Sequence, residues 1–259
     1  MSTVFYRYVW AVLMMAVVMV ASRRSFRLAK KEYAVCLGLG LFFVSSSLLL
    51  FLSFNYMDAG MASTILFSYP IMVAVIMTVF FHERVTVSTV TSLVLAVAGV
   101  VMLSHGEGGA SVMGVVLVLA SSLTYAVYIV AINRLDVKIS SITLTFYVAV
   151  VAVFALFVAG EFGLCGGLQL LPSARAALWS AQLGLFPTVL SLIFINISIK
   201  LVGSTPAAIM GALEPLTAVC IGVMVFGEHL TGKLILGMAM ILTAVMLIIL
   251  NNNKKNSSI

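Results

Sequence analysis

Charged residues are scarce in this chain. Lys, Arg, Asp and Glu together make up 8% of its 259 residues, whereas an ordinary soluble domain has roughly a quarter. Apolar residues make up 63% of the sequence, so there is too little polar side chain to cover a compact globule of this length. This composition excludes a water-soluble fold. Because the apolar residues form long blocks, unlike the roughly ten-residue alternating strands of a membrane barrel, we predict an all-α, polytopic membrane helix bundle.

Cysteine and histidine are also rare, with three of each. The cysteines Cys36, Cys165 and Cys220 are far apart and form no CxxC motif, which argues against a disulfide framework or a zinc site. His82-Glu83 lacks the second histidine of a zinc-protease helix, and the sequence has no ATP-binding motif. We therefore expect no metal, no cofactor and no enzymatic activity.

Apolar windows of about 20 residues predict nine membrane-spanning helices joined by short loops. Their approximate bounds are Thr3–Ala21, Ala34–Phe54, Gly60–Phe81, Ser88–Ser104, Met113–Asn133, Ile142–Ala159, Ala177–Ser198, Thr205–Phe226 and Leu234–Leu250.

The net charge is +6, but lysine and arginine flank the apolar blocks. We therefore interpret the basic residues as signals for helix orientation and predict no nucleic-acid site. Basic loops stay in the cytoplasm during insertion. If the loop after the first helix is cytoplasmic, 11 of the 14 basic residues lie on that side, and Arg7, Arg175 and Lys233 lie on the other. We therefore predict a multi-pass protein of the cell (inner) membrane with a cytoplasmic C-terminus and a non-cytoplasmic N-terminus.

The two halves of the chain align when one is shifted by 145 residues. The shift places Pro70 on Pro215 and Glu83 on Glu228 without a gap. Five crossings separate the matched helices, and because five is odd, the two copies have opposite topology. Inverted repeats are characteristic of secondary transporters, in which two similar halves open the centre to either side.

The predicted repeats are residues 1–108, with four helices, and residues 109–259, with five helices and a short cytoplasmic tail. The same shift maps the helix Met113–Asn133 to a position before residue 1, so the first repeat is one helix short. We favour a missing first span over a lineage that tolerates its loss.

Each half has a small-residue helix start, a proline within the span and a glutamate that closes the helix. The matching motifs are Tyr69-Pro70 with Glu83-Arg84-Val85-Thr86, and Glu214-Pro215 with Gly227-Glu228-His229-Leu230-Thr231. In these motifs the sequence resembles the EamA-type branch of the drug/metabolite transporter superfamily. The resemblance implies ten helices in two inverted halves and export of an amino acid or drug-like compound.

Glu214 is the strongest candidate for chemistry, because it lies about ten residues into a predicted span and so near the bilayer midplane. An ionised carboxylate at that depth costs at least ~2.5 to 3.5 kcal/mol, so it should face the bundle interior or be protonated. It could bind a cationic or amine group or take up a proton. The structural alternative is that it caps a backbone donor beside Pro215.

Tyr69 and Pro70 lie at the matching depth in the first half. A proline removes an amide donor from the helix and frees a carbonyl, so Pro70 and Pro215 are candidate hinges, with a simple packing kink as the alternative.

Two further polar patterns follow helical spacing. Ser121, Tyr125 and Tyr128 form one polar face, which suits interhelical hydrogen bonds or substrate contact. Gln182 and Asn196 are fourteen residues apart, close to four turns of a regular helix, so both could line a pathway. The predicted substrate-binding set is therefore Glu214, Tyr69, Tyr125, Gln182 and Asn196.

The sequence thus predicts a secondary transporter, an exporter of a small polar metabolite that works by alternating access. The alternative is a non-transporting membrane subunit, a helix-truncated remnant that binds a partner. The expected partners are the lipid bilayer, a small-molecule substrate and, if transport is coupled to them, protons; a homodimer is left open.

Overall fold

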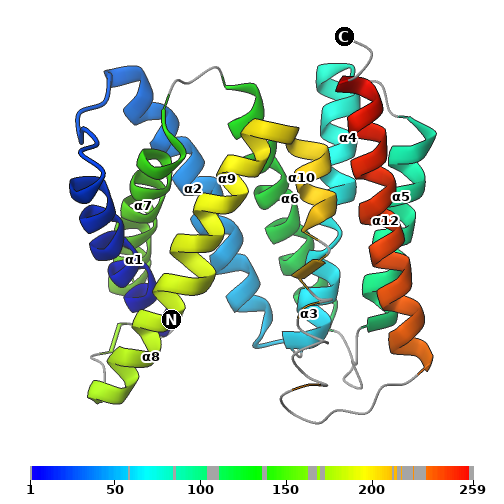
Figure 1. Cartoon of the computed structure of the whole chain (residues 1–259). Helices are drawn as coiled ribbons and strands as arrows, with labels where there is room; N and C mark the ends of the chain where they lie inside the picture. Colours follow the sequence, from blue (N-terminus) through cyan, green and yellow to red (C-terminus); the bar gives the residue numbers. More distant parts are fainter. Residues whose placement is uncertain are drawn as a thin grey trace.

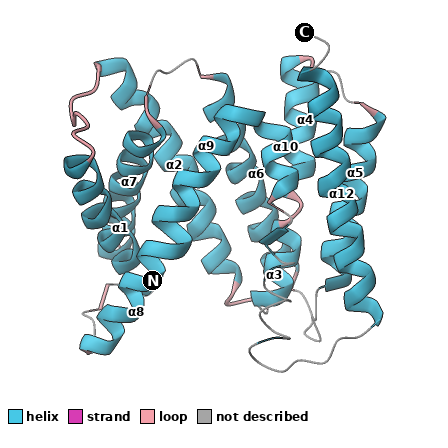
Figure 2. Cartoon of the chain, viewed as in Figure 1, coloured by secondary structure: helices cyan, strands magenta, loops and turns pink. Residues whose placement is uncertain are grey.

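The computed structural model describes residues 2–57, 59–83, 86–103, 111–135, 139–162, 168–169, 173–211, 213–214, 217, 224 and 232–256. Every regular element within these ranges is a helix (Figure 2). Most of the helices lie side by side along one common direction (Figure 1). The all-helical bundle predicted from composition is confirmed.

Most of the described helices begin and end within a few residues of the predicted apolar windows. They are α1 (Ser2–Ala21), α2 (Lys30–Ser53), α3 (Ala59–Leu66), α4 (Tyr69–Phe81), α5 (Val87–Leu103), α6 (Val112–Arg134), α7 (Ser141–Glu161), α8 (Ala174–Gly184), the π-helix η1 (Leu185–Leu190), α9 (Ser191–Val202), α10 (Ser204–Met210) and α12 (Gly232–Asn256). Most of the predicted span Thr205–Phe226 beyond α10 lies outside the described residues.

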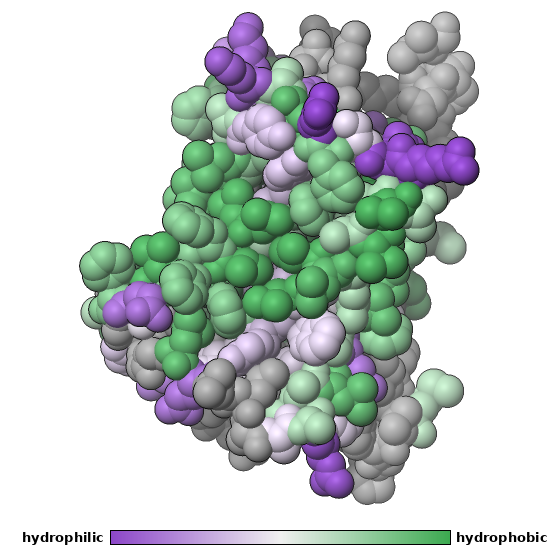
Figure 3. Space-filling model, turned by 90° about the vertical axis from the view of Figure 1, so that its left-hand side faces the viewer, coloured by the Kyte–Doolittle hydropathy of each residue, from purple (hydrophilic) through white to green (hydrophobic). Residues whose placement is uncertain are grey.

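Five described stretches are long and apolar enough to cross a membrane: α1, α2, α6, α7 and the continuous run α8–η1–α9. Helices α4, α5 and α12 contain shorter apolar segments of the same kind. Large apolar side chains cover the outside, including Val17, Phe154 and Phe194, which are 65 to 69% exposed. Figure 3 shows a band of hydrophobic residues across one face, between more hydrophilic ends. A bilayer is the solvent that such a band requires.

Small residues let the helices approach closely. Gly99 of α5 faces α12, where an added Cβ would lie 2.8 Å from the carbonyl oxygen of Gly237. The Ser88 hydroxyl at the start of α5 donates to the carbonyl of Leu247 near the end of α12, so the two helices are antiparallel. The interior of the bundle is closed by large buried side chains such as Tyr8, Tyr128 and Leu156.

A basic loop lies at one end of the bundle. The loop between α1 and α2, with Arg23, Arg24 and Arg27, lies at the upper end in Figure 1, where α6 and α9 also finish. Helices α1, α8 and α12 begin at the lower end. The basic loop is anchored on α7, because the Tyr147 hydroxyl donates to the carbonyl of Phe26.

Matched helices of the two halves start at equivalent positions. Helix α3 begins at residue 59 and α10 at residue 204, and α5 begins at residue 87 and α12 at residue 232, which is the predicted shift of 145 in both cases. In Figure 1, α3 begins at the lower end of the bundle and α10 at the upper end.

Among the spans that the structure describes throughout, two are not continuous α-helices, and each break lies at a proline. The span Gly60–Phe81 divides into α3 and α4 just before Pro70, where the Leu66 carbonyl instead accepts a hydrogen bond from the Ser122 hydroxyl of α6, at 3.1 Å. The span Ala177–Ser198 contains η1 around Pro187, and the Leu183 carbonyl accepts from the hydroxyl of Thr188 at 3.0 Å.

Candidate substrate pathway

A cluster of aromatic rings occupies the centre of the bundle. Tyr69 begins α4 and packs edge-on against Tyr125 of α6, with 5.0 Å between ring centroids. Tyr125 stacks on Tyr128 at 6.0 Å, since the two residues share one face of α6. Phe43 of α2 contacts the Tyr128 ring at 5.3 Å and the Tyr8 ring of α1 at 6.1 Å. We call these five residues the aromatic cluster.

Tyr69 joins the two predicted repeats. Its hydroxyl donates to the carbonyl of Ala208 in α10 at 3.2 Å. Gly211, just after α10, allows this approach, because a Cβ at that position would lie 1.9 Å from the Tyr69 hydroxyl oxygen. The glycine is therefore required by close packing against the ring of Tyr69.

Glu214 lies beside the aromatic cluster. Its carboxylate is close enough to Tyr69 and Tyr125 for its charge to act on both phenols. Its backbone N–H donates to the Gly211 carbonyl at 3.0 Å, which fixes the turn that places it there. The side chain is exposed, so the carboxylate can meet a ligand. Three of the predicted substrate-binding residues, Glu214, Tyr69 and Tyr125, are thus brought together.

Asn196 takes part in helix packing. Its Oδ1 accepts a hydrogen bond from the Tyr128 hydroxyl at 2.9 Å, and its Nδ2 donates to Thr145 at 3.0 Å. These bonds connect α9 to α6 and α7, and the side chain is fully buried. Both ends of the amide are therefore already used, which favours a structural role over direct substrate contact.

Gln182 does not share the environment of Asn196. It lies on an exposed side of α8, and no contact among the described residues links it to the aromatic cluster. Pro215, the second predicted hinge, lies outside the described residues, as does Glu228. Within the described part of the chain, no three His, Cys, Asp or Glu side chains gather as metal ligands.

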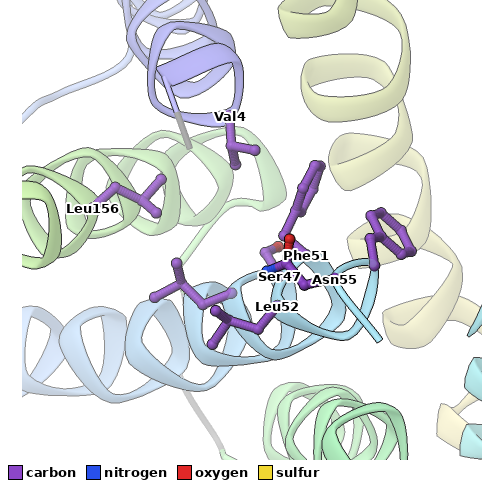
Figure 4. Close-up of a pocket in the computed structure, with 8 residues that line it drawn as sticks. Val4, Ser47, Phe51, Leu52, Asn55 and Leu156 are labelled. Carbon is purple, nitrogen blue, oxygen red and sulfur yellow. The ribbon is translucent and has the colours of Figure 1, made fainter. Parts of the chain in front are cut away.

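A cavity of about 460 Å³ opens between α1, α2 and α7, towards the lower end of the bundle. Figure 4 shows Val4 from α1, Leu156 from α7, Ser47, Phe51 and Leu52 from α2, and Asn55 just after α2 around it. The volume falls within the range of about 300 to 1,000 Å³ typical of small-molecule sites. Ser47 connects the cavity to the aromatic cluster, because its hydroxyl lies 2.9 Å from that of Tyr8.

The sequence alone did not point to four residues of the aromatic cluster and the helix breaks: Tyr8, Phe43, Ser122 and Pro187. Tyr8 and Phe43 lie in apolar blocks among 8 tyrosines and 16 phenylalanines, so no pattern distinguishes them. Pro187 was a detectable signal, because a proline inside a membrane span always leaves a carbonyl to be satisfied by another group.

These features define a polytopic α-helical membrane protein with broken spans and a polar, aromatic interior. The chain belongs to the EamA-like transporter family, whose model matches residues 1–105 and 112–250. The predicted resemblance is confirmed, and the family identifies the chain as a membrane transporter.

Relatives that match the chain are named only as transporters. An uncharacterized transporter of Archaeoglobus fulgidus is 29% identical over 196 residues, covering 73% of this chain and 67% of the relative. The uncharacterized transporter YvbV of Bacillus subtilis is 28% identical over 208 residues, which cover 75% of this chain and 64% of YvbV. A crystal structure superposes with a TM-score of 0.80 at 18% identity, covering 97% of this chain and 88% of the other, which shows a shared fold.

Proposed function

We propose that the chain is a secondary transporter that exports a small polar metabolite across the cell membrane by alternating access. The observation that carries this proposal is that Glu214 lies beside Tyr69 and Tyr125, two rings of the buried aromatic cluster. An ionisable side chain inside a membrane span is costly and is retained mainly where it binds a substrate or moves a proton. The phenol rings supply apolar contact area and hydroxyls beside it.

Two inverted repeats would allow the two halves of the protein to exchange conformations during alternating access. The equal spacing of α3 with α10 and of α5 with α12 supports a duplication, as do the two segments matched by the family model. The opposite starting ends of α3 and α10 support inversion (Figure 1). In this arrangement we propose Pro70, just after the break between α3 and α4, and Pro215 as the bending points, and Tyr69 as the contact across which the repeats move.

The proposal is tested with purified protein in liposomes. We expect an imposed proton gradient, or substrate loaded on the opposite side, to drive uptake of at least one labelled compound from a panel of amino acids and drug-like amines. Protein-free liposomes and liposomes without a gradient are the controls. Protein that binds a panel compound but never carries it across, under either driving force, would contradict transport and favour the alternative of a non-transporting membrane subunit.

The proposed orientation has its own test. In a cysteine-free background, a single cysteine at Ser25, in the exposed loop between α1 and α2, is expected to resist impermeant thiol reagents in intact cells. A single cysteine at Ser173, exposed just before α8 at the other end, is expected to react readily. The reverse pattern would show the opposite orientation. Labelling at both positions would contradict the proposed crossing of the membrane.

A further inference from the structure

The connection from α1 to α2 concentrates positive charge that the proposed pathway does not use. It carries five basic residues, all of them exposed: Arg23, Arg24, Arg27, Lys30 and Lys31. Among the described residues, no carboxylate forms an ion pair with any of the five. Glu32 is the nearest acidic residue in sequence, and its carboxylate accepts a hydrogen bond from the backbone N–H of Ala29 at 2.8 Å. We call these five side chains the basic cluster, and they are free to meet an anion.

Aromatic residues hold this loop on the bundle. The Phe26 carbonyl accepts hydrogen bonds from the hydroxyls of Tyr147 in α7 and Tyr33 in α2. The Phe26 ring packs edge-on against Phe146, with 5.5 Å between ring centroids, and the two tyrosine rings meet edge-on at 5.4 Å. Aromatic side chains are enriched at the level of the lipid headgroups. The loop therefore presents its cations from a fixed position at the end of two membrane spans.

Local stability does not explain where these cations lie. Arg23, just after α1, has a φ of +50°, in the left-handed region that glycine adopts most easily. Lys30 and Lys31 are the first two residues of α2, where the positive end of the helix dipole disfavours cations. Basic residues at these three positions therefore cost local stability, and an anion bound beside them would offset that cost.

An exposed apolar track leads from the basic cluster along α1. Leu13, Val17 and Val20 follow one face of this helix and are 53 to 68% exposed. The track ends in a groove of about 330 Å³ between α1 and α7. The groove has an entirely apolar lining, which includes Phe5, Val9 and Leu13 from α1 and Val150, Phe154 and Phe157 from α7. Leu13 lies about 10 Å along the helix from Val20, within the depth of about 15 Å of one leaflet, so an acyl chain can follow the track into the groove.

We propose that the basic cluster and this groove form a binding site for an anionic phospholipid such as phosphatidylglycerol. The basic side chains contact the phosphate, and an acyl chain lies along α1 and enters the groove between α1 and α7. Charge complementarity selects the anionic headgroup, and the apolar track selects a membrane lipid over a soluble phosphate. Lipid binding requires no transport, so this inference does not depend on the proposed function.

The site is tested by thermal unfolding of the full-length protein in a neutral detergent, because a ligand that binds the folded state raises its Tm. The probe is dioleoyl phosphatidylglycerol. Dioleoyl phosphatidylcholine, with the same chains and no net charge, and glycerol 3-phosphate, with the charge and no chains, are the controls. We expect phosphatidylglycerol to raise the Tm clearly more than phosphatidylcholine does, and glycerol 3-phosphate to have no effect.

Charge variants locate the site on the protein. The double variant Arg24→Gln with Arg27→Gln should weaken phosphatidylglycerol binding at least about tenfold, because each basic residue near a membrane surface adds to the attraction. Arg24→Lys with Arg27→Lys keeps both charges and should retain most of the binding. The matched control is Arg175→Gln with Lys233→Gln, which removes two exposed charges at the opposite end of the bundle (Figure 1) and should leave binding unchanged.

A second loop variant, Lys30→Gln with Lys31→Gln, keeps the test decisive if the first does not fold. Removing cations from the start of a helix does not weaken it, so α2 should stay folded while phosphatidylglycerol binding falls. Equal Tm shifts for the two lipids would overturn the proposal, as would wild-type phosphatidylglycerol binding in both loop variants or an equal loss in the control variant. A Tm shift with glycerol 3-phosphate as large as that with phosphatidylglycerol would make the loop a site for soluble phosphate and reject the lipid.

Discussion

Glu214→Gln is expected to lower gradient-driven flux at least tenfold while the amount of folded protein in the membrane stays the same. Glutamine keeps the size of the side chain and removes the charge that acts on Tyr69 and Tyr125. A hydrogen bond to a charged group contributes about 1.5 to 3 kcal/mol, which corresponds to about one to two factors of ten in affinity. The measurement is initial flux in liposomes, normalised to the protein recovered as a single peak in size-exclusion chromatography.

The control for this variant is Glu161→Gln, which makes the same change at an exposed position at the end of α7. It should leave flux unchanged. If Glu214 carries the coupled proton, the residual flux of Glu214→Gln no longer responds to an imposed pH gradient. A variant that keeps its full response to that gradient would exclude Glu214 as the proton carrier, and one that keeps full flux would exclude it from the pathway.

The positions of the helices could be read from the sequence because lipid imposes a simple rule. A spanning segment must satisfy its backbone internally over about 20 apolar residues, so apolar windows predict helices directly. Helices α1, α2, α6 and α7 therefore begin and end within a few residues of their predicted bounds. The effect of a proline inside a window is a tertiary property. The Leu66 carbonyl freed near Pro70 depends on Ser122 of another helix, a partner that local sequence does not reveal.

The π-helix η1 interrupts the regular spacing from which Gln182 and Asn196 were predicted to point the same way. Fourteen residues make four turns only in an uninterrupted α-helix. A π-helix closes its hydrogen bonds between residues i and i+5, which changes the angular position of everything after it. Gln182 precedes η1 and is exposed, whereas Asn196 follows it and is fully buried.

The central residues were predictable where two signals coincided. Glu214 was found because it lies deep in a predicted span, Tyr69 because it lies at the matching depth in the first half, and Tyr125 because it belongs to a polar stripe on α6. Arg7 was interpreted at first only as a marker of orientation, since its burial and its contact with Tyr8 depend on how α1 packs. A charged residue inside an apolar block can mark helix orientation or a functional site, and the packing of the helices distinguishes the two.

Gly211→Ala is expected to destabilise the protein by about 1 to 3 kcal/mol, the typical cost of forcing an extra group into a packed interior. The new Cβ would lie 1.9 Å from the Tyr69 hydroxyl oxygen, so the buried ring must move and lose its bond to the Ala208 carbonyl. Flux should fall as well, because Tyr69 is the contact between the proposed repeats. Gly38→Ala is the matched control, since a Cβ there has nothing within 4 Å and replaces glycine in the helix α2.

Tyr69→Phe provides the specific test of this packing argument. It removes the overlapping oxygen and leaves the ring, whose nearest carbon would lie 3.3 Å from the new Cβ. The double variant Gly211→Ala with Tyr69→Phe should therefore be more stable than the sum of the two single effects predicts, by about 0.5 to 3 kcal/mol. Stability is measured by thermal unfolding in detergent. Strictly additive effects would show that Gly211 serves the backbone turn before Glu214 and that the contact with Tyr69 is incidental.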